Sequence, residues 1–186
     1  MMADSPVQQP TLHGEGFVLR LLGPSDAVAL HAAGQDDDIG RYTSLPWPFT
    51  LTAAEQLIAD AERGWQAGTA ARFAIVVEQS GAEEFAGTAS LLHLFPERAD
   101  AEVGYWLAGS ARGRGLARRA VELLCGWALG PFGLRRLHLL VDLDNGGSHA
   151  VARACGFLPI GELPWQHPTD PRKDAVCLAY ERLNSP

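Results

Sequence analysis

The sequence lacks the features of exported, membrane-bound and metal-binding proteins. No apolar run reaches the roughly 18 residues of a membrane-spanning helix, and the polar segment 1–16 has no apolar signal-peptide core. The three cysteines are widely spaced without a CxxC pair, and no two histidines have the spacing of metal ligands. These absences predict a protein of the reducing cytoplasm with neither a disulfide framework nor a metal site.

Positive charge is also scarce, since 15 basic residues stand against 22 acidic ones and the formal net charge is −7. Such a chain lacks the general electrostatic attraction that nucleic acids and anionic membranes require, so neither is an expected partner. The phosphate-binding pattern GxxxxGK[ST] is absent, and GxGxxG fails because Arg118 stands where its third glycine belongs. Any site for an anion must therefore be local.

The length of 186 residues, 47% of them hydrophobic, predicts one compact domain over 16–183 after a polar N-terminal tail at 1–15. Residue periodicity predicts strands at 17–22, 72–77, 84–94, 101–107, 135–141, 157–161 and 175–181. Helices are predicted from Ser25, over 52–66 with Thr52 and Glu55 as a capping box, from 116 to Gly130, and over 147–155. Two prolines predict a loop within 36–49. The fold class is therefore mixed α/β (α+β) with a largely antiparallel sheet.

Residues 112–117, Arg-Gly-Arg-Gly-Leu-Ala, lie between a predicted strand and the first turn of a predicted helix. A helix begins with unpaired N–H groups at the positive end of its dipole, and the glycines allow those groups to close on an anion. Arg112, Arg114, Arg118 and Arg119 add local positive charge to an acidic chain. This turn predicts a site for a small anion such as a pyrophosphate, although such a pattern alone also arises by chance in a chain rich in Gly, Ala and Arg.

The segments around this turn make the pattern more specific. Glu-Val-Gly-Tyr-Trp-Leu precedes it at 102–107, Asp-Leu-Asp-Asn follows at 142–145, and Cys-Gly-Phe closes the series at 155–157. In this order the segments resemble the GNAT superfamily of N-acetyltransferases, and within it the RimJ/RimL-like branch of ribosomal-protein N-terminal acetyltransferases. The resemblance is strong from 102 to 157 and loose before 72. It implies a twisted sheet, flanked by helices, whose fourth and fifth strands splay apart to admit coenzyme A.

The resemblance also implies which residues hold acetyl-CoA, the acyl donor. Main-chain groups of Trp106 and Leu107 would pair with the pantetheine arm, Asn145 would lie beside that arm, and Arg112 begins the motif whose backbone amides bind the pyrophosphate. The implied cofactor-binding residues are Trp106, Leu107, Arg112, Gly113, Arg114, Gly115, Leu116, Ala117, Arg118, Asn145 and Ser148.

One position departs from the pattern of the superfamily. Many members carry a tyrosine seven residues after the asparagine, as the acid that protonates the departing thiolate, but this chain has Ala152 there. The resemblance implies that Ser148 points at the sulfur, where its hydroxyl would stabilise the thiolate by hydrogen bonding or relay a proton from water. The alternative is that Ser148 is only the N-terminal cap of the next helix.

The reaction also needs a base, because an acceptor amine is mostly protonated at neutral pH. Glu102 is the first candidate, since strand alternation places it on one face with Gly104 and Trp106, from which it could look into the cleft directly or through a water. The alternative is a solvent-facing carboxylate. His93, on the preceding strand, is the second candidate, because imidazole exchanges protons near neutral pH.

The acceptor side is less well defined by sequence. The resemblance implies that a backbone N–H near Trp106, freed by a strand bulge, stabilises the oxyanion. It also implies that the region containing Trp47 and Phe49 shapes the acceptor pocket, so these two residues and His93 are the candidate substrate-binding residues. A proline-stiffened aromatic loop of this kind would equally serve to fill the core.

These observations lead to one main hypothesis and one alternative. The main hypothesis is a cytoplasmic N-acetyltransferase that moves an acetyl group directly from acetyl-CoA to a primary amine, either a protein N-terminal α-amine or a small-molecule amine. Glu102 is its general base, Ser148 its thiolate stabiliser or acid, and the protein is a monomer or a homodimer. The alternative is a non-catalytic acyl-CoA-binding or sensing protein of the same fold, for which the missing tyrosine is the argument. Acetyl versus a longer acyl group stays open.

Overall fold

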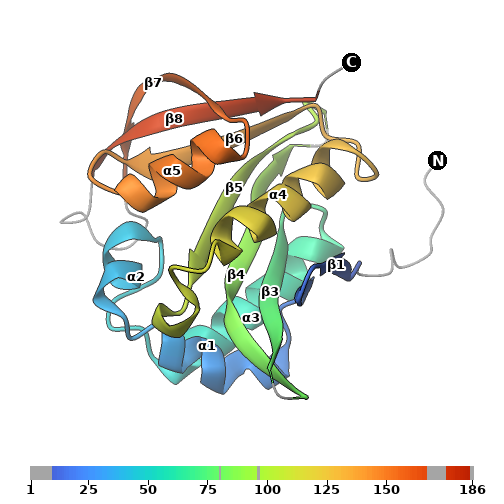
Figure 1. Ribbon diagram of the computed structural model, residues 1–186, viewed down its shortest axis with the longest axis vertical. Coiled ribbons are helices and arrows are strands. Elements are labelled where there is room, and N and C mark those ends of the chain that lie inside the picture. Colours follow the sequence, from blue (N-terminus) through green and yellow to red (C-terminus); the bar gives the residue numbers. More distant parts are fainter. Residues whose placement is uncertain (1–9, 80, 96, 167–174, 185–186) are drawn as a thin grey trace.

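An open, twisted sheet of eight strands forms the centre of the molecule (Figure 1). The structure is a computed structural model that describes residues 10–79, 81–95, 97–166 and 175–184, so residues 1–9 of the predicted tail lie outside it. The strands are β1 (Leu12–Gly14), β2 (Phe17–Leu21), β3 (Ala71–Gln79), β4 (Ala82–Phe95), β5 (Asp100–Leu107), β6 (Arg136–Asp142), β7 (Leu158–Trp165) and β8 (Ala175–Leu183). The helices are α1 (Ala27–Ala33), α2 (Asp37–Tyr42), α3 (Leu51–Gln66), α4 (Leu116–Leu129) and α5 (Gly146–Ala154).

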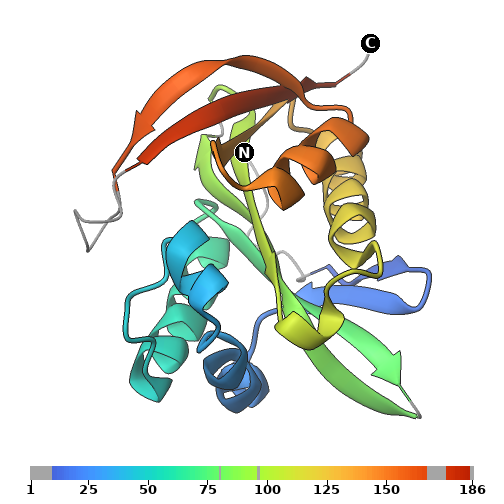
Figure 2. The ribbon, with the colours of Figure 1, turned by 60° about the vertical axis from the view of Figure 1, so that its left-hand side comes forward.

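Helices cover both faces of this sheet (Figures 1 and 2). On one face, α4 and α5 pack on the larger core cluster, and α4 buries a stripe formed by Ala120, Val121, Leu124 and Ala128. On the other face, α1, α2 and α3 enclose a second cluster that includes Leu30. No helix in the described part of the chain is long and apolar enough to cross a membrane.

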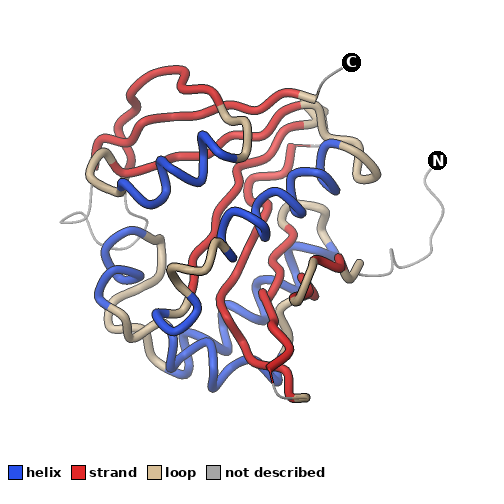
Figure 3. The backbone as a smooth tube through the Cα atoms, viewed as in Figure 1, coloured by secondary structure: helices blue, strands red, loops and turns tan. Residues whose placement is uncertain are grey.

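The strand order is β1-β2-β3-β4-β5-β6-β8-β7, and every neighbouring pair is antiparallel except β5 and β6. These two parallel strands pair only from Asp100↔Arg136 to Glu102↔His138, although β5 continues to Leu107. Beyond Glu102 the strands separate (Figure 3). They are the fourth and fifth strands of the sequence pattern, so the predicted splay and the predicted fold class are confirmed.

Two helix predictions need correction. Helix α2 lies inside the segment predicted to be a loop, because the Asp36 side chain accepts the N–H of Asp38 at 3.0 Å and caps a helix before the prolines begin. Helix α3 was correctly predicted, but its cap was not: Thr50, and not Thr52, accepts the N–H of Ala53, at 3.1 Å. A short capping side chain two residues earlier therefore determines where α3 begins.

Strand β1 was not predicted, because Leu12–Gly14 lie in the segment interpreted as a polar tail. The strand pairs with β2 from Leu12↔Leu19 to Gly14↔Phe17, and only three residues take part. A strand this short has no readable alternation in the sequence. The remaining strand and helix predictions are confirmed to within a few residues.

Candidate active site

A cavity of about 450 Å³ opens where β5 and β6 separate. Its walls come from α2, the end of β5, the first turn of α4 and the start of α5. All the residues predicted to bind the cofactor line this cavity except Arg114. Segments that lie more than half of the chain apart in sequence therefore meet at one hollow.

The turn between β5 and α4 leaves its backbone N–H groups without partners. Gly113 and Gly115 have φ angles of 77° and 70°, a left-handed conformation that glycine adopts at little cost. Within the described residues, no N–H group from Gly113 to Arg118 donates a hydrogen bond, and the first bonded amide is that of Arg119, to the Gly115 carbonyl at 3.2 Å. Six successive donors at the positive end of the α4 dipole form an anion-binding turn.

Arg112 does not contribute a free charge to this turn. Its Nε donates to the Leu107 carbonyl at 3.1 Å, and its guanidinium forms ion pairs with Asp36 at 3.1 Å and Asp38 at 3.2 Å. Arg112 therefore connects α2 to the end of β5. The prediction that Arg112 adds positive charge to the turn is wrong, because the carboxylates of Asp36 and Asp38 neutralise it.

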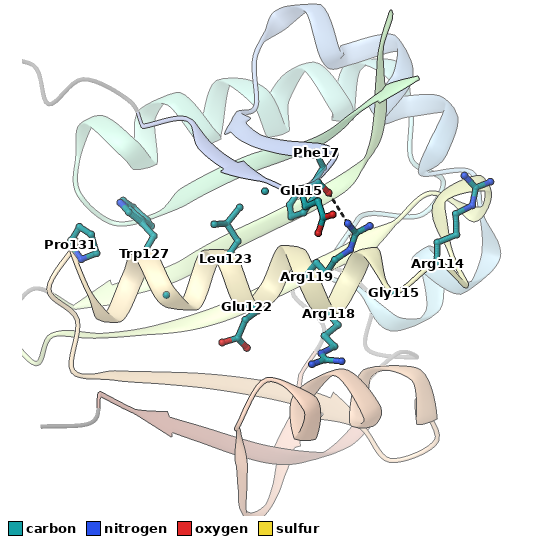
Figure 4. Close-up of a pocket in the computed structure, with 12 residues that line it drawn as sticks. Glu15, Phe17, Arg114, Gly115, Arg118, Arg119, Glu122, Leu123, Trp127 and Pro131 are labelled. Atoms are coloured by element: carbon teal, nitrogen blue, oxygen red, sulfur yellow. Dashed lines mark hydrogen bonds between the residues drawn. The ribbon is translucent and has the colours of Figure 1, made fainter. Parts of the chain in front are cut away.

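The Arg119 side chain already has partners within the protein, whereas those of Arg114 and Arg118 have none among the described residues and could contact an anion. The Arg119 guanidinium donates to the Glu15 carbonyl at 2.7 Å and lies over the Phe17 ring, 5.4 Å from its centroid (Figure 4). Arg118 leaves α4 on the opposite side. Among the described residues, the side chains of Arg114 and Arg118 have no hydrogen bond or ion pair. Two of the four arginines thus remain to meet an anion.

A second, larger hollow of about 900 Å³ adjoins the turn on the outer side of α4. It lies between α4 and the β1–β2 hairpin, and Figure 4 shows Leu123, Trp127 and Pro131 following one another along its wall. Gly115 and Arg118 line both hollows, so the anion-binding turn separates them.

At the far side of the cavity, Asn145 and Ser148 are joined at the start of α5. The Asn145 side chain is the N-terminal cap, and its Oδ1 accepts the backbone N–H of Ser148 at 3.1 Å. The alternative interpretation of Ser148 as the cap is therefore wrong. Asn145 holds the backbone of Ser148 in place. The Ser148 hydroxyl does not cap the helix, and Ser148 lines the cavity.

Neighbouring residues of β5 reach the two faces of the sheet. Tyr105 packs against the larger cluster on the α4–α5 side, whereas Trp106 packs against the second cluster and meets the Phe85 ring at 6.0 Å between centroids. Both line the cavity, which consequently passes through the gap in the sheet. By strand alternation Glu102 lies on the same face of the sheet as Trp106. Ser148 belongs to α5, which covers the opposite face, where Tyr105 lies.

Glu102 is half-buried and is the last residue of β5 that pairs with β6. Burial raises the pKa of its carboxyl above the usual value, and the nearby His93 opposes this rise. Glu102 does not line the cavity. His93 is exposed, lies at a β-bulge of β4 with a φ of 49°, and does not line the cavity either.

Neither aromatic residue predicted for the acceptor pocket lines the cavity. Phe49 is only 1% exposed in the second cluster, which matches the core-filling alternative. Trp47 is 45% exposed and lies against Gly40 of α2, where an added Cβ would come within 2.6 Å of its ring. Trp47 thus supports α2. The end of α2 supplies Tyr42 to the wall, and Thr43 follows it directly; neither was predicted from the sequence.

The predicted bulge near Trp106 is absent. Pairing between β4 and β5 runs without a shift from Gly87↔Leu107 to Leu92↔Glu102, and the register shift lies beyond Leu92. Among the described strands, none pairs with this edge of β5 beyond Glu102, because β6 diverges from it. The separation of the strands, and not a bulge, therefore exposes the main-chain groups near Trp106.

The three cysteines are buried and lie outside the cavity. Burial raises the pKa of Cys125 to about 12 and those of Cys155 and Cys177 to about 11, so their thiols are poor nucleophiles at neutral pH. Among the described residues, no group of three or more His, Cys, Asp or Glu side chains could hold a metal ion.

Comparison with known proteins decides the family. The model of the acetyltransferase (GNAT) domain matches residues 17–158, most of the chain. The chain belongs to the GNAT acetyltransferase family. This acetyltransferase is 30% identical over 173 residues to the ribosomal-protein-serine acetyltransferase of Escherichia coli, with 86% of this chain and 94% of that protein covered. It is 29% identical over 154 residues to an uncharacterized N-acetyltransferase, p20, of Bacillus licheniformis, covering 82% and 85%.

Solved structures show the same fold at lower identity. A RimL ribosomal L7/L12 α-N-protein acetyltransferase in complex with coenzyme A superposes with a TM-score of 0.82 at 22% identity, covering 94% of this chain and 98% of that one. A spermidine N-acetyltransferase from Vibrio cholerae, in complex with coenzyme A and spermine, gives 0.77 at 19% identity and covers 92% and 97%. Together with the family match and the 30% identical ribosomal-protein acetyltransferase, this shared fold confirms the resemblance to RimJ/RimL-type enzymes, and the chain is an acetyl-CoA-dependent N-acetyltransferase of this type.

Proposed function

We propose that this acetyltransferase moves the acetyl group directly from acetyl-CoA to a primary amine while both are bound, with Glu102 as general base and Ser148 as thiolate stabiliser. The observation that carries the proposal is the run of unpartnered N–H groups from Gly113 to Arg118 beside a cavity between diverging strands. When bound, acetyl-CoA supplies an activated thioester whose thiol departs as the amide forms.

The residues of the site suit a coenzyme A molecule. The free amides from Gly113 to Arg118 would hold the pyrophosphate together with the side chain of Arg118, which has no hydrogen bond or ion pair among the described residues. Arg114 lines only the outer hollow and would approach the phosphates from that side. The edge of β5 at Trp106 and Leu107 offers main-chain groups to the amides of the pantetheine arm. Asn145 uses its Oδ1 for the helix cap, so its Nδ2 group is left to donate to a carbonyl of that arm.

Proton handling is divided between the two faces of the sheet. Glu102, on the Trp106 face, accepts a proton from the attacking amine through water, since it does not line the cavity itself. Ser148, on the Tyr105 face, donates a hydrogen bond to the departing sulfur. A main-chain N–H on the unpaired edge of β5 stabilises the oxyanion. The buried, weakly acidic cysteines support direct transfer without a covalent enzyme intermediate.

For the acceptor, we propose a protein N-terminal α-amine, with serine as the first residue to test. The support is the 30% identical relative named a ribosomal-protein-serine acetyltransferase. A small amine is the second candidate. The polar residues Asp38 and Tyr42 of α2, with Thr43 directly after it, form the wall that either acceptor would meet.

The test combines calorimetric binding of acetyl-CoA with thiol release in the presence of peptides that begin with serine or alanine and of polyamines. We expect binding and turnover with at least one acceptor class. Glu102→Gln and Ser148→Ala should lower kcat with little change in acetyl-CoA affinity. Binding without turnover on any acceptor supports the sensing alternative, and absence of binding overturns both readings.

A further inference from the structure

Tyr105 carries a polar group that the site, as described, does not use. It lies on β5 and lines the cavity together with Ser148, which reaches the same cavity from the opposite side, on α5. The phenolic oxygen is buried, and no described residue partners it at hydrogen-bonding geometry. A buried hydroxyl without a partner is unfavourable, so folds retain one chiefly where it acquires a partner during function.

We propose that Tyr105 is a positioning residue for the transfer step: its phenolic O–H donates a hydrogen bond to the Ser148 Oγ and thereby turns the single Ser148 hydrogen toward the departing sulfur. The inference rests on the proposed function, because it assumes that Ser148 acts on the sulfur.

Three features of the site support this arrangement. The Ser148 backbone cannot drift away, since its N–H is held by the Asn145 Oδ1 at 3.1 Å. Both residues line one cavity and the Ser148 hydroxyl acts on the Tyr105 phenol, so the two groups are neighbours, and the serine side chain turns about a single bond. A serine hydroxyl has two acceptor sites but one hydrogen, so an accepted bond from Tyr105 leaves that hydrogen for the cavity.

The direction of the bond follows from the environment of the phenol. Burial raises the pKa of Tyr105 to about 12, the Ser148 hydroxyl acts against this rise, and Cys155 adds to it. The phenol keeps its proton at neutral pH and has no acceptor among the described residues, whereas the Ser148 hydrogen can turn to the sulfur, so the phenol is the donor and the Ser148 Oγ the acceptor. Tyr105 stays protonated throughout and transfers no proton of its own.

The experiment measures kcat, KM for acetyl-CoA and thermal stability for Tyr105→Phe, Ser148→Ala and the double variant. Tyr105→Phe should lower kcat about threefold to tenfold, the size of one lost hydrogen bond, with KM changed less than about twofold. In the Ser148→Ala background the same substitution should have almost no effect, because the group it positions is gone. Stability should stay level or rise, since the removed hydroxyl has no partner.

Tyr180→Phe is the matched control. The Tyr180 hydroxyl is also attached to α5, through a bond of 2.9 Å to the His149 Nδ1, but Tyr180 does not line the cavity. Its loss should lower the melting temperature and leave kcat unchanged, the reverse of the Tyr105 pattern. This contrast separates positioning of the Ser148 hydroxyl from mechanical support of α5.

The outcomes distinguish this inference from the proposed function. If Ser148→Ala leaves kcat unchanged, the role of Ser148 is wrong, and the inference fails with it. If Ser148→Ala lowers kcat but Tyr105→Phe does not, or does so equally in both backgrounds, only the inference is overturned. A drop in both stability and kcat for Tyr105→Phe, with no rescue of kcat at lower temperature, assigns Tyr105 a structural role and also overturns it.

Discussion

The guanidinium of Arg112 lies 3.1 Å from the carboxylate of Asp36, which precedes α2 by one residue. This ion pair joins the anion-binding turn to the start of α2, which lines the cavity. On the other side of the cleft, Arg41 of α2 forms an ion pair with Asp144, just before Asn145. Helix α2 is therefore fastened to both diverging parts of the sheet and spans the opening between them.

The division of the arginines predicts unequal effects on cofactor affinity. Arg114→Gln and Arg118→Gln should each raise the Kd for acetyl-CoA about fivefold, because each removes one charge-assisted contact to a phosphate at an exposed site. Arg119→Gln is the control, since its guanidinium bonds the Glu15 carbonyl, and it should change Kd less than about twofold. Calorimetry at two salt concentrations is the measurement, and equal effects at all three positions would contradict the assignment.

Arg112→Gln should act differently from its neighbours. It removes the connection between α2 and β5, so the melting temperature should fall while the Kd for acetyl-CoA changes little. The exposed ion pair itself contributes at most about 1 kcal/mol, and the bond to the Leu107 carbonyl adds to that. A large loss of acetyl-CoA affinity without loss of stability would show that Arg112 meets the anion directly.

The conformation of the anion-binding turn can be tested at Gly113. Its φ of 77° is costly for any residue with a Cβ, by about 1–2 kcal/mol, although the space around it is open. Gly113→Ala should therefore weaken acetyl-CoA binding and lower stability by about this amount. Gly126→Ala, within α4 and also free of nearby atoms, is the control, and it should stabilise by up to about 1 kcal/mol. Calorimetry and denaturant unfolding distinguish the two.

Sequence reasoning found the elements of the site but not their contacts. The series from Glu102 to Phe157 was sufficient to predict the anion-binding turn from local pattern and the family from the order of its segments, and the splay followed only through that resemblance. The cap of Asn145 on the Ser148 N–H is a local contact over three residues, but the sequence offered Ser148 as the cap in its place. The partners of Arg112 depend on which side chains meet across the fold, and α2 was hidden by neighbouring prolines. No spacing in a single sequence encodes such contacts. Tyr105 shows the same limit, since only burial reveals that its hydroxyl is unpartnered.

Glu102 predicts opposite pH effects on activity and on stability. Because burial raises the pKa of its carboxyl, the acid limb of kcat/KM should lie above the usual range of a glutamate, with activity rising as Glu102 loses its proton. The folded state holds this proton more tightly than the unfolded state does. The free energy of unfolding therefore loses this contribution as pH rises from the usual glutamate pKa through the raised one.

Glu102→Gln should remove both effects. At neutral pH we expect kcat to fall at least about 100-fold while the melting temperature rises, because an uncharged amide avoids the cost of a buried carboxylate. The measurements are kcat/KM from pH 5 to 9 and thermal unfolding over the same range. A variant with full activity would assign the base to another group, with His93→Gln the next variant to examine.

The close approach of β4 to β5 predicts a strict requirement for glycine at position 87. An added Cβ at Gly87 would lie 2.2 Å from the Trp106 carbonyl oxygen, and its φ is 147°, so both space and backbone exclude a larger residue. Gly87→Ala should destabilise the fold by about 2–4 kcal/mol, since β4 or β5 must shift to relieve the clash. Gly104→Ala is the control on β5: its Cβ would meet only the Leu92 side chain, at 3.4 Å, and the cost should stay below about 1 kcal/mol. Urea unfolding compares the two variants, and equal stability would show that the sheet adjusts at Gly87 without strain.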